Sequence, residues 1–386
     1  PGYENSITEK NTDFKPPQIC LKSVKSLNKI DILFSEPIDT SFISQINIDC
    51  KPLEVTNIKI EKATLSIEVS PSFTNKNNYS FQIANISDEC GNIANIFRFS
   101  VLINTPGTND LLINELLFNP LPGGDDFIEL YNNSDFPIDI SSLYLATRDE
   151  SIMLKSVSRI TAQENKLPPK RYCLITTDPQ HILEQYSVPI KENIQKTDKL
   201  PAMNNTEGRV VLLNDSMNVV DEVYYHESMH SDWIYDTEGV SLERISFLKS
   251  SNTSGNWQSA SSLAGFATPG YENSQFTDEL EYNDIKVELE SEIISPNGDG
   301  YQDKLVLNIT GNSSGYLINL FVFDVNGNEK KRILNNELTG THNEIIYNLA
   351  YNNGLTLQAG TYILFLEMIH LQKETFSCKK AFHITR

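Results

Sequence analysis

Residues 111–147 read LLINELLFNPLPGGDDFIELYNNSDFPIDISSLYLAT, and this stretch decides the fold. Apolar and polar residues alternate through 127–131, stop at a cluster of Asn, Ser and Asp, and resume at Ile138. Runs of period two that are broken by Asn, Asp, Gly and Pro are typical of short antiparallel strands joined by tight turns. The prolines and glycines of 120–124 exclude a helix across the first connection. The stretch therefore predicts the opening of a β-sandwich.

The same stretch resembles the opening of the bacterial lamin-tail domain, an Ig-like sandwich. The matching segments in 111–147 are Ile113-Asn114-Glu115, Asp126 to Leu130, Asn133-Ser134-Asp135 and Leu143-Tyr144-Leu145. Further matches follow at Gly208 to Leu212, Val220 to Tyr225, Gly239 to Arg244, Asn256-Trp257 and Thr268 to Asn273. The resemblance implies an all-β domain over about 165 residues, but it does not imply one function, because this fold carries many.

The chain has 386 residues, which predicts more than one domain. We expect an all-β protein of three tandem Ig-like β-sandwich domains, at 16–105, 106–276 and 277–386. At most one short helix is expected, in the middle domain, where 180–186 follow Asp178 as N-cap and Pro179 as the first helical residue.

Residues 1–15 predict a linker, and their first six residues repeat later in the chain. Pro1 to Ser6 and Pro269 to Ser274 are identical, and the second copy lies just after the last strand of the lamin-tail resemblance. We therefore expect that another lamin-tail domain precedes residue 1 in a parent chain built as a tandem array.

The flanking domains carry resemblances of their own. Residues 16–105 are similar to S-layer-type Ig-like domains through Phe34 to Asp39 and Asp88 to Asn92. Residues 277–386 begin with an acidic linker at 277–281. They resemble the Ig-like domain of flagellar hook-capping proteins and the C-terminal domains of surface-secreted bacterial proteins. That likeness rests on Ser295 to Gly300, Phe323 to Gly327 and Ala359 to Tyr362.

The composition excludes several partners. A formal net charge of −20 repels nucleic acid and anionic membranes, so neither is expected to bind. No run of about 18 apolar residues occurs, and no membrane insertion is predicted. Five scattered cysteines do not form a disulfide framework. A bridge from Cys90 to either Cys50 or Cys20 stays open, and Cys173 and Cys378 are expected to be buried in strands.

One stretch spells a zinc-protease motif, His226-Glu227-Ser228-Met229-His230. Zinc binding through this motif needs an α-helix that presents both imidazoles on one face. The residues before it, 219–225, alternate as a strand, so we expect a connection between two strands. A zinc metalloprotease remains a remote alternative, and a weak metal site at His226 and His230 a somewhat better one.

Calcium is the one cofactor that the sequence suggests. Asn297, Asp299 and Asp303 place oxygen donors in the alternating rhythm of a short calcium loop. The glutamate that closes an EF-hand loop is missing, because Asn308 occupies its position. The competing interpretation is a glycine-rich turn whose side chains bond local backbone amides. For Asp88 and Asn92, which could also ligate a cation, the turn interpretation is favoured.

Two further clusters suggest chemistry. Asp125, Asp126 and Glu129 could serve glycoside hydrolysis, but strand alternation puts Asp125 and Glu129 on one face and Asp126 on the other. A solvated face is the favoured interpretation. An aromatic set could bind sugar or peptide, although core or rim positions are expected more often. Its members are Trp233, Trp257, Tyr224, Tyr225 and Tyr235.

No catalytic constellation survives, and we expect no enzyme. The sequence favours a non-catalytic structural, adhesion or scaffold segment of a larger secreted or cell-surface bacterial protein. The expected partners are other domains of the parent protein and a surface polymer or protein ligand. The main alternative is a set of accessory modules, for substrate binding or spacing, of a secreted hydrolase whose catalytic domain lies outside this chain.

Overall fold

The computed structural model describes residues 13–149, 151–277, 285–311, 315–348, 357–371 and 373–385. It divides into two compact units, Pro1–Thr105 and Pro106–Arg386. Most of the linker predicted at 1–15, the Pro1 to Ser6 repeat and most of the acidic linker at 277–281 lie outside the described residues.

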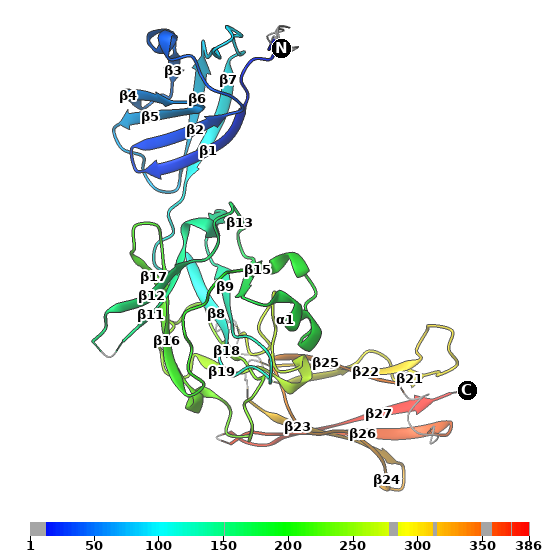
Figure 1. Ribbon diagram of the computed structural model, residues 1–386. Coiled ribbons are helices and arrows are strands. Elements are labelled where there is room, and N and C mark those ends of the chain that lie inside the picture. The colour runs from blue at the N-terminus through cyan, green and yellow to red at the C-terminus, as the bar shows by residue number, and fades with distance from the viewer. Residues whose placement is uncertain are drawn as a thin grey trace, which may run out of the picture. The chain divides into compact units, whose positions relative to one another are not determined.

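The first unit is a sandwich of two antiparallel sheets (Figure 1). In its described part, one sheet has the strand order β1-β2-β5-β4 and the other β3-β6-β7. Alternate residues of β5, namely Leu65, Ile67 and Val69, point into a core shared by both sheets. The strands are β1 Ile19–Ser26, β2 Lys29–Phe34, β3 Asn47–Asp49, β4 Glu54–Glu61, β5 Thr64–Ser70, β6 Asn77–Ala84 and β7 Phe97–Ile103.

The second unit begins with the region that the sequence likens to a lamin-tail domain. Its larger sheet has the described order β15-β14-β9-β8-β18-β19 and faces a sheet of order β12-β11-β16-β17; β10 and β13 pair separately. Side chains of both larger sheets fill one core. The strands are β8 Leu111–Leu117, β9 Phe127–Asn132, β10 Ile138–Asp139, β11 Tyr144–Arg148, β12 Leu154–Arg159, β13 Lys166–Leu167, β14 Tyr172–Thr176, β15 Ile194–Lys196, β16 Glu207–Leu213, β17 Val219–His226, β18 Leu242–Arg244 and β19 Trp257–Ser259.

The predicted short helix is present. Helix α1 spans Pro179–Gln185, and the Asp178 carboxylate caps it by accepting from the backbone N–H groups of Gln180 and His181. It is the only α-helix within the described ranges. None of the helices described is long and apolar enough to cross a membrane.

The C-terminal part of the second unit is a second sandwich. Among its described residues, one sheet has the order β20-β22-β25 and the other β21-β27-β26-β23-β24, around one core. The hairpin turn predicted at 325–328 joins β23 to β24, and Asp324 accepts from the backbone N–H groups of Asn326 and Asn328. The strands are β20 Lys286–Leu289, β21 Ile293–Ile294, β22 Lys304–Thr310, β23 Leu317–Asp324, β24 Glu329–Leu338, β25 His342–Asn348, β26 Gly360–Ile369 and β27 Phe376–Ile384.

The predicted all-β, Ig-like fold class is therefore confirmed. The cysteine predictions fare less evenly. All five cysteines are free thiols, so Cys90 forms neither candidate bridge. Cys173 is buried as predicted, but Cys378 is only half-buried. Strand β21 covers β27 only at His383 and Ile384, so the Cys378 end of β27 lies at an open sheet edge.

Candidate functional site

The zinc-protease motif does not lie on an α-helix. Strand β17 ends at His226, and Glu227–Met229 form a single 3-10 turn (η4). The Nδ1 atom of His226 accepts from the backbone N–H of Ser228 at 3.0 Å and thereby caps that turn. The predicted connection between two strands, β17 and β18, is confirmed, and the helical geometry that zinc proteolysis needs is not present.

His230, the second imidazole of the motif, belongs to a different environment. Its side chain is 7% exposed, packs on the ring of Phe118 and hydrogen-bonds through Nδ1 to the Ser259 hydroxyl at 2.9 Å. Burial lowers the pKa of His230 to about 4, so the imidazole is neutral near pH 7. Its Nε2 atom is buried and has no hydrogen-bond partner among the described residues.

One acidic trio is close enough to share a cation among the residues described. Ligand atoms of Asp13, Glu36 and Asp88 lie within 4.8 Å of one another in the first unit. Asp88, however, accepts from the backbone N–H groups of Cys90 and Asn92. Burial by itself would raise the pKa of Asp88, but the hydrogen bonds from Asn92 and Cys90 outweigh it and lower that pKa. The turn chemistry favoured from the sequence is thus present there.

The predicted calcium loop is exposed, and its side chains bond the loop itself. Asp303 accepts from the backbone N–H groups of Gly298 and Gly300, both at 2.7 Å. Asn297 accepts from the N–H of Asp299, whose carboxylate accepts from the N–H of Tyr301. These are the contacts of the competing turn interpretation. Calcium binding by Asn297, Asp299 and Asp303 stays a prediction.

Calcium binding and turn formation make different predictions for thermal unfolding. Asp303→Ala removes the acceptor of two backbone N–H groups, so it should lower the melting temperature with or without calcium. If calcium binds, millimolar calcium should also raise the melting temperature of the wild type, and Asp299→Ala should abolish that rise. Magnesium at the same concentration is the control. The calcium prediction would be refuted if calcium left the melting temperature of the wild type unchanged.

A row of three buried glutamates crosses the larger sheet, the one that contains β8, β9 and β18. Glu115 on β8 lies directly opposite Glu129 on β9 and Glu243 on β18. All three side chains are 0% exposed. The solvated face expected for Glu129 is therefore wrong, whereas Asp125 and Asp126 are half-buried. Strands β8 and β9 are buried along their whole length, because the sheet is covered on both faces.

Residues 268–275 cover this row and supply its hydrogen-bond donors; we call them the closing segment. The backbone N–H of Thr268 donates to Glu115 at 2.9 Å, and the N–H of Gly270 donates to Glu129. The N–H of Gln275 donates to Glu243 at 2.8 Å. The Thr268 hydroxyl donates to Glu243 at 2.7 Å and lies 3.3 Å from a Glu115 oxygen. The closing segment contains the sequence that recurs at Pro1 to Ser6.

A β-bulge completes the network. Asn114 is the extra residue between Ile113 and Glu115, and a bulge of this kind re-aims a side chain. Its amide donates to Glu129 at 2.9 Å and to the Asn273 side chain at 2.6 Å. The Asn273 amide in turn donates to the Arg244 carbonyl at 2.9 Å. Every glutamate of the row is thus hydrogen-bonded, and the closing segment is fixed to three strands.

The row shifts the titration of its members. Burial, followed by the charge of Glu243, raises the pKa of Glu115 to about 8. Burial and the charge of Glu115 raise the pKa of Glu129 well above its usual value, and burial also raises the pKa of Glu243. The folded protein therefore holds protons near neutral pH that the unfolded chain has already released.

This linkage predicts a stability that falls as the pH rises. A carboxyl with a raised folded pKa contributes most below its unfolded value of 4.5, and the contribution is lost toward the folded value of about 8. For Glu115 alone we expect the free energy of unfolding to drop by about 3–4 kcal/mol between pH 5 and pH 8. Denaturant unfolding at the two pH values measures it.

The matched variants are Glu115→Gln and the exposed Glu344→Gln. Glutamine at 115 keeps the shape of glutamate but cannot ionise, so the drop should shrink, whereas the substitution on β25 should leave it unchanged. Equal drops in the wild type and in Glu115→Gln would contradict this account of the row.

The five aromatic residues noted in the sequence separate into three environments. Tyr225 is buried in the core and stacks on Phe118, with ring centroids 4.4 Å apart. Tyr235 is fully exposed. Tyr224, Trp233 and Trp257 line a common groove. The predicted aromatic cluster is therefore only partly assembled.

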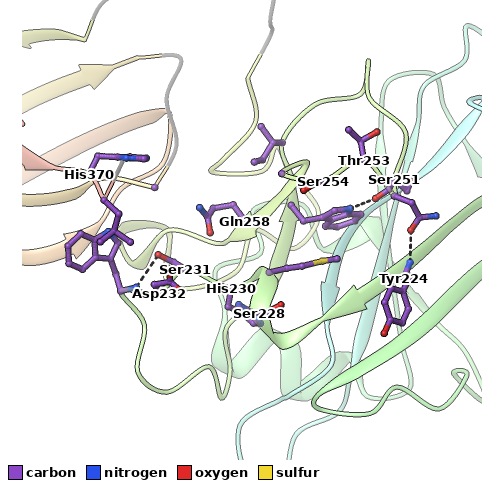
Figure 2. Close-up of a pocket in the computed structure, with 18 of the residues that line it drawn as sticks. Tyr224, Ser228, His230, Ser231, Asp232, Ser251, Thr253, Ser254, Gln258 and His370 are labelled. Atoms are coloured by element: carbon purple, nitrogen blue, oxygen red, sulfur yellow. Dashed lines mark hydrogen bonds between the residues drawn. The ribbon is translucent and has the colours of Figure 1, made fainter. Parts of the chain in front are cut away.

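The groove has a volume of about 830 Å³ and is formed by loops that the fold brings together. Figure 2 shows its labelled residues extending from His370 on one side, past Gln258, to Thr253 and Tyr224 on the other. The lining residues are Arg209, Tyr224, Ser228 to Trp233, Ile245, Ser251 to Gly255, Trp257, Gln258, Gly315, His370, Leu371 and Lys373. The last four come from the C-terminal sandwich.

Hydrogen bonds hold the loop 251–255 of the groove in place. The Asn252 side chain accepts from the backbone N–H of Tyr224 at 2.8 Å and donates to the Glu222 carbonyl at 2.9 Å. The Trp257 indole donates to the Ser251 carbonyl at 2.7 Å. Arg244, which is 1% exposed, donates to the Ser251 hydroxyl and pairs with Asp221 at 3.1 Å. The loop is thereby fixed to β17, β18 and β19.

Comparison with known proteins finds a family match in this region. Residues 104–227 match the family model described as the Lamin Tail Domain. This match confirms the predicted resemblance for that part of the chain. No curated protein matches the chain. The resemblance of the C-terminal sandwich to hook-capping and surface-secreted proteins stays a prediction.

Solved structures give only distant likenesses. The N-terminal part of the bacterial S-layer protein SbsC is 13% identical, over 54% of this chain and 43% of that chain, with a TM-score of 0.25. A DUF4876 family protein from Bacteroides thetaiotaomicron is 13% identical, over 53% and 84%, with a TM-score of 0.26. A tetra-tandem repeat from the extending region of a large adhesion protein is 9% identical, over 94% and 73%, with a TM-score of 0.18. The chain spans less than half of the first of these structures, and likenesses at this level indicate nothing about activity or partners.

Proposed function

We propose that the second unit is a rigid, non-catalytic scaffold segment of a larger secreted or surface-displayed bacterial protein. The observation that carries the proposal is the double attachment of the closing segment. Its inner side bonds the glutamate row of the lamin-tail sheet. Its outer side bonds the C-terminal sandwich. The same segment is therefore hydrogen-bonded to both sandwiches of the second unit.

The outer attachment consists of backbone and side-chain hydrogen bonds. The carbonyl of Ser274 accepts from the backbone N–H of Thr341 at 2.8 Å, and the Phe276 carbonyl accepts from the Thr341 hydroxyl at 2.6 Å. The Gln275 amide donates to the Thr339 carbonyl at 3.0 Å. Phe276 follows the closing segment directly, and two more distant residues add to the attachment. The Ser261 hydroxyl donates to the Leu338 carbonyl at 2.7 Å, and the backbone N–H of Leu338 donates to the Ser262 hydroxyl at 2.9 Å.

The residues of this junction are buried. Ser261, Gln275, Thr339 and Thr341 are between 0% and 3% exposed. Separating the two sandwiches would exchange these hydrogen bonds for bonds to water, at a net cost of about 0.5–1.5 kcal/mol for each bond. The two sandwiches should therefore move and unfold together, which is what a spacer or scaffold requires.

Two parts of the proposal go beyond the junction. Secretion or surface display rests on the resemblances of the flanking domains. Calcium bound by Asn297, Asp299 and Asp303 would stiffen the loop 297–303 of the second unit. The alternative, accessory modules of a secreted hydrolase, would use the same rigid unit to hold a substrate polymer. The two functions differ in whether the unit binds a saccharide.

Gly340 offers a direct test of the junction. A Cβ atom at Gly340 would lie 2.2 Å from the Ser274 carbonyl oxygen, so alanine must push the two sandwiches apart. We expect Gly340→Ala to lower the free energy of unfolding by about 1–3 kcal/mol. It should also split the shared unfolding transition of the second unit into two. Scanning calorimetry of the full chain, with amide exchange across 261–277 and 338–343, measures both effects.

Glu344→Ala, an exposed substitution two residues into β25, is the matched control and should leave the transition single. The proposal that the second unit is rigid would be refuted if the two sandwiches of the wild type already unfolded in separate steps.

A further inference from the structure

The groove lined by Tyr224, Trp233 and Trp257 plays no part in the scaffold described above. We propose that it is a binding site for a neutral oligosaccharide. The inference goes beyond the proposed function, because a rigid spacer needs no ligand. It rests on unpaired polar atoms, on the chemistry of the lining and on the position of the aromatic rings.

Two buried nitrogen atoms of the groove residues have no partner. The Nε2 atom of His230 and the Nε1 atom of Trp233 are enclosed, and neither forms a hydrogen bond within the described residues. His230 is more than nine-tenths buried and lines the groove. Because buried polar groups are nearly always paired, two such atoms in one groove indicate a ligand that supplies the partners. Both nitrogens are enclosed, so each ring must turn slightly toward the groove before its nitrogen can pair with a sugar hydroxyl.

The remaining polar groups favour a neutral ligand. Hydroxyl and amide side chains are the most numerous polar groups of the lining, among them Ser228, Thr253, Ser254 and Gln258. The lining also holds one acidic residue, Asp232, and Lys373, whose ammonium lies over the Tyr316 ring, so the charges nearly balance. Arg209 is already engaged, since its guanidinium lies over the Tyr224 ring and 3.6 Å from Glu222. Neutral His230 adds no charge at pH 7. Sites with a few convergent polar groups and aromatic walls are typical of small-ligand pockets, and about 830 Å³ falls within their usual size range.

The aromatic side chains supply apolar faces for sugar rings. Trp233 is half-buried and Tyr224 is 39% exposed, so both present ring surface, whereas Trp257 forms the floor at 6% exposure. An extended peptide is a weaker candidate, because it would need free backbone groups on an edge strand. At the edge strand β19, the Gln258 side chain accepts the backbone N–H of Ser259 at 3.1 Å.

The two tryptophans make the test simple. They are the only tryptophans of the chain, and both line the groove. We would titrate the full chain with linear hexasaccharides of glucose, mannose and N-acetylglucosamine and follow tryptophan fluorescence. At least one probe should give a saturable change in emission, with isothermal calorimetry returning the same dissociation constant.

Three variants locate the binding. Trp233→Phe keeps a ring but loses the N–H and should weaken binding, whereas Trp233→Ala should weaken it at least about tenfold, equal to about 1.4 kcal/mol. Ser254→Arg, on an exposed loop, should block the groove without removing any core side chain. Tyr235→Ala is the matched control: it removes a fully exposed ring two residues away and should bind like the wild type.

Unchanged melting temperatures would show that the variants remain folded. The proposal fails if none of the hexasaccharides gives a saturable change. It also fails if Trp233→Ala and Ser254→Arg bind the saccharide as tightly as the wild type. A mixture of unstructured decapeptides is titrated in parallel, and the proposal fails if only these peptides bind. None of these results bears on the Gly340→Ala test, so the groove and the scaffold can fail independently.

Discussion

Burying three carboxyl groups side by side in one sheet is the constraint on which the second unit depends. Glu115 faces both Glu129 and Glu243 across the strands, and like charges directly opposite one another destabilise a sheet. The closing segment offsets this by donating backbone N–H groups to all three residues. Because that segment also bonds Thr339 through Gln275 and Thr341 through Ser274, the cost of the buried row is coupled to the junction between the two sandwiches.

Much of the fold could be predicted from local pattern. Alternation located most strands, and the Asp178-Pro179 pair located helix α1. Alternation gave the wrong prediction for Glu129. A period of two indicates a strand with one buried and one solvent-exposed face, whereas β9 is buried on both faces. A usable signal was present: Glu115 and Glu129 stand in short apolar runs, and all three glutamates lie within segments that resemble the lamin-tail family. Glutamates that recur in such segments predict carboxyl groups that pair inside the sheet, which periodicity alone cannot show.

The groove could be anticipated only in part. Trp233, Trp257 and Tyr224 belong to three separate segments, and no local rule indicates that η4, the loop 251–255 and the loop carrying His370 meet. Nor could the sequence separate buried Tyr225 from Tyr224, its neighbour on β17, without knowing which face of the strand meets the core. The His226 to His230 motif misleads for a similar reason, because its spacing has the proposed chemistry only on a helix.

The position of the closing segment has a consequence for biosynthesis. Strands β8 and β9 are translated more than a hundred residues before Thr268 to Gln275, so their buried glutamates lack these hydrogen-bond donors until the closing segment has been made. The sheet cannot bury these side chains until the chain has supplied strands β18 and β19 and the closing segment. The sheet can therefore be completed only after the closing segment has left the ribosome.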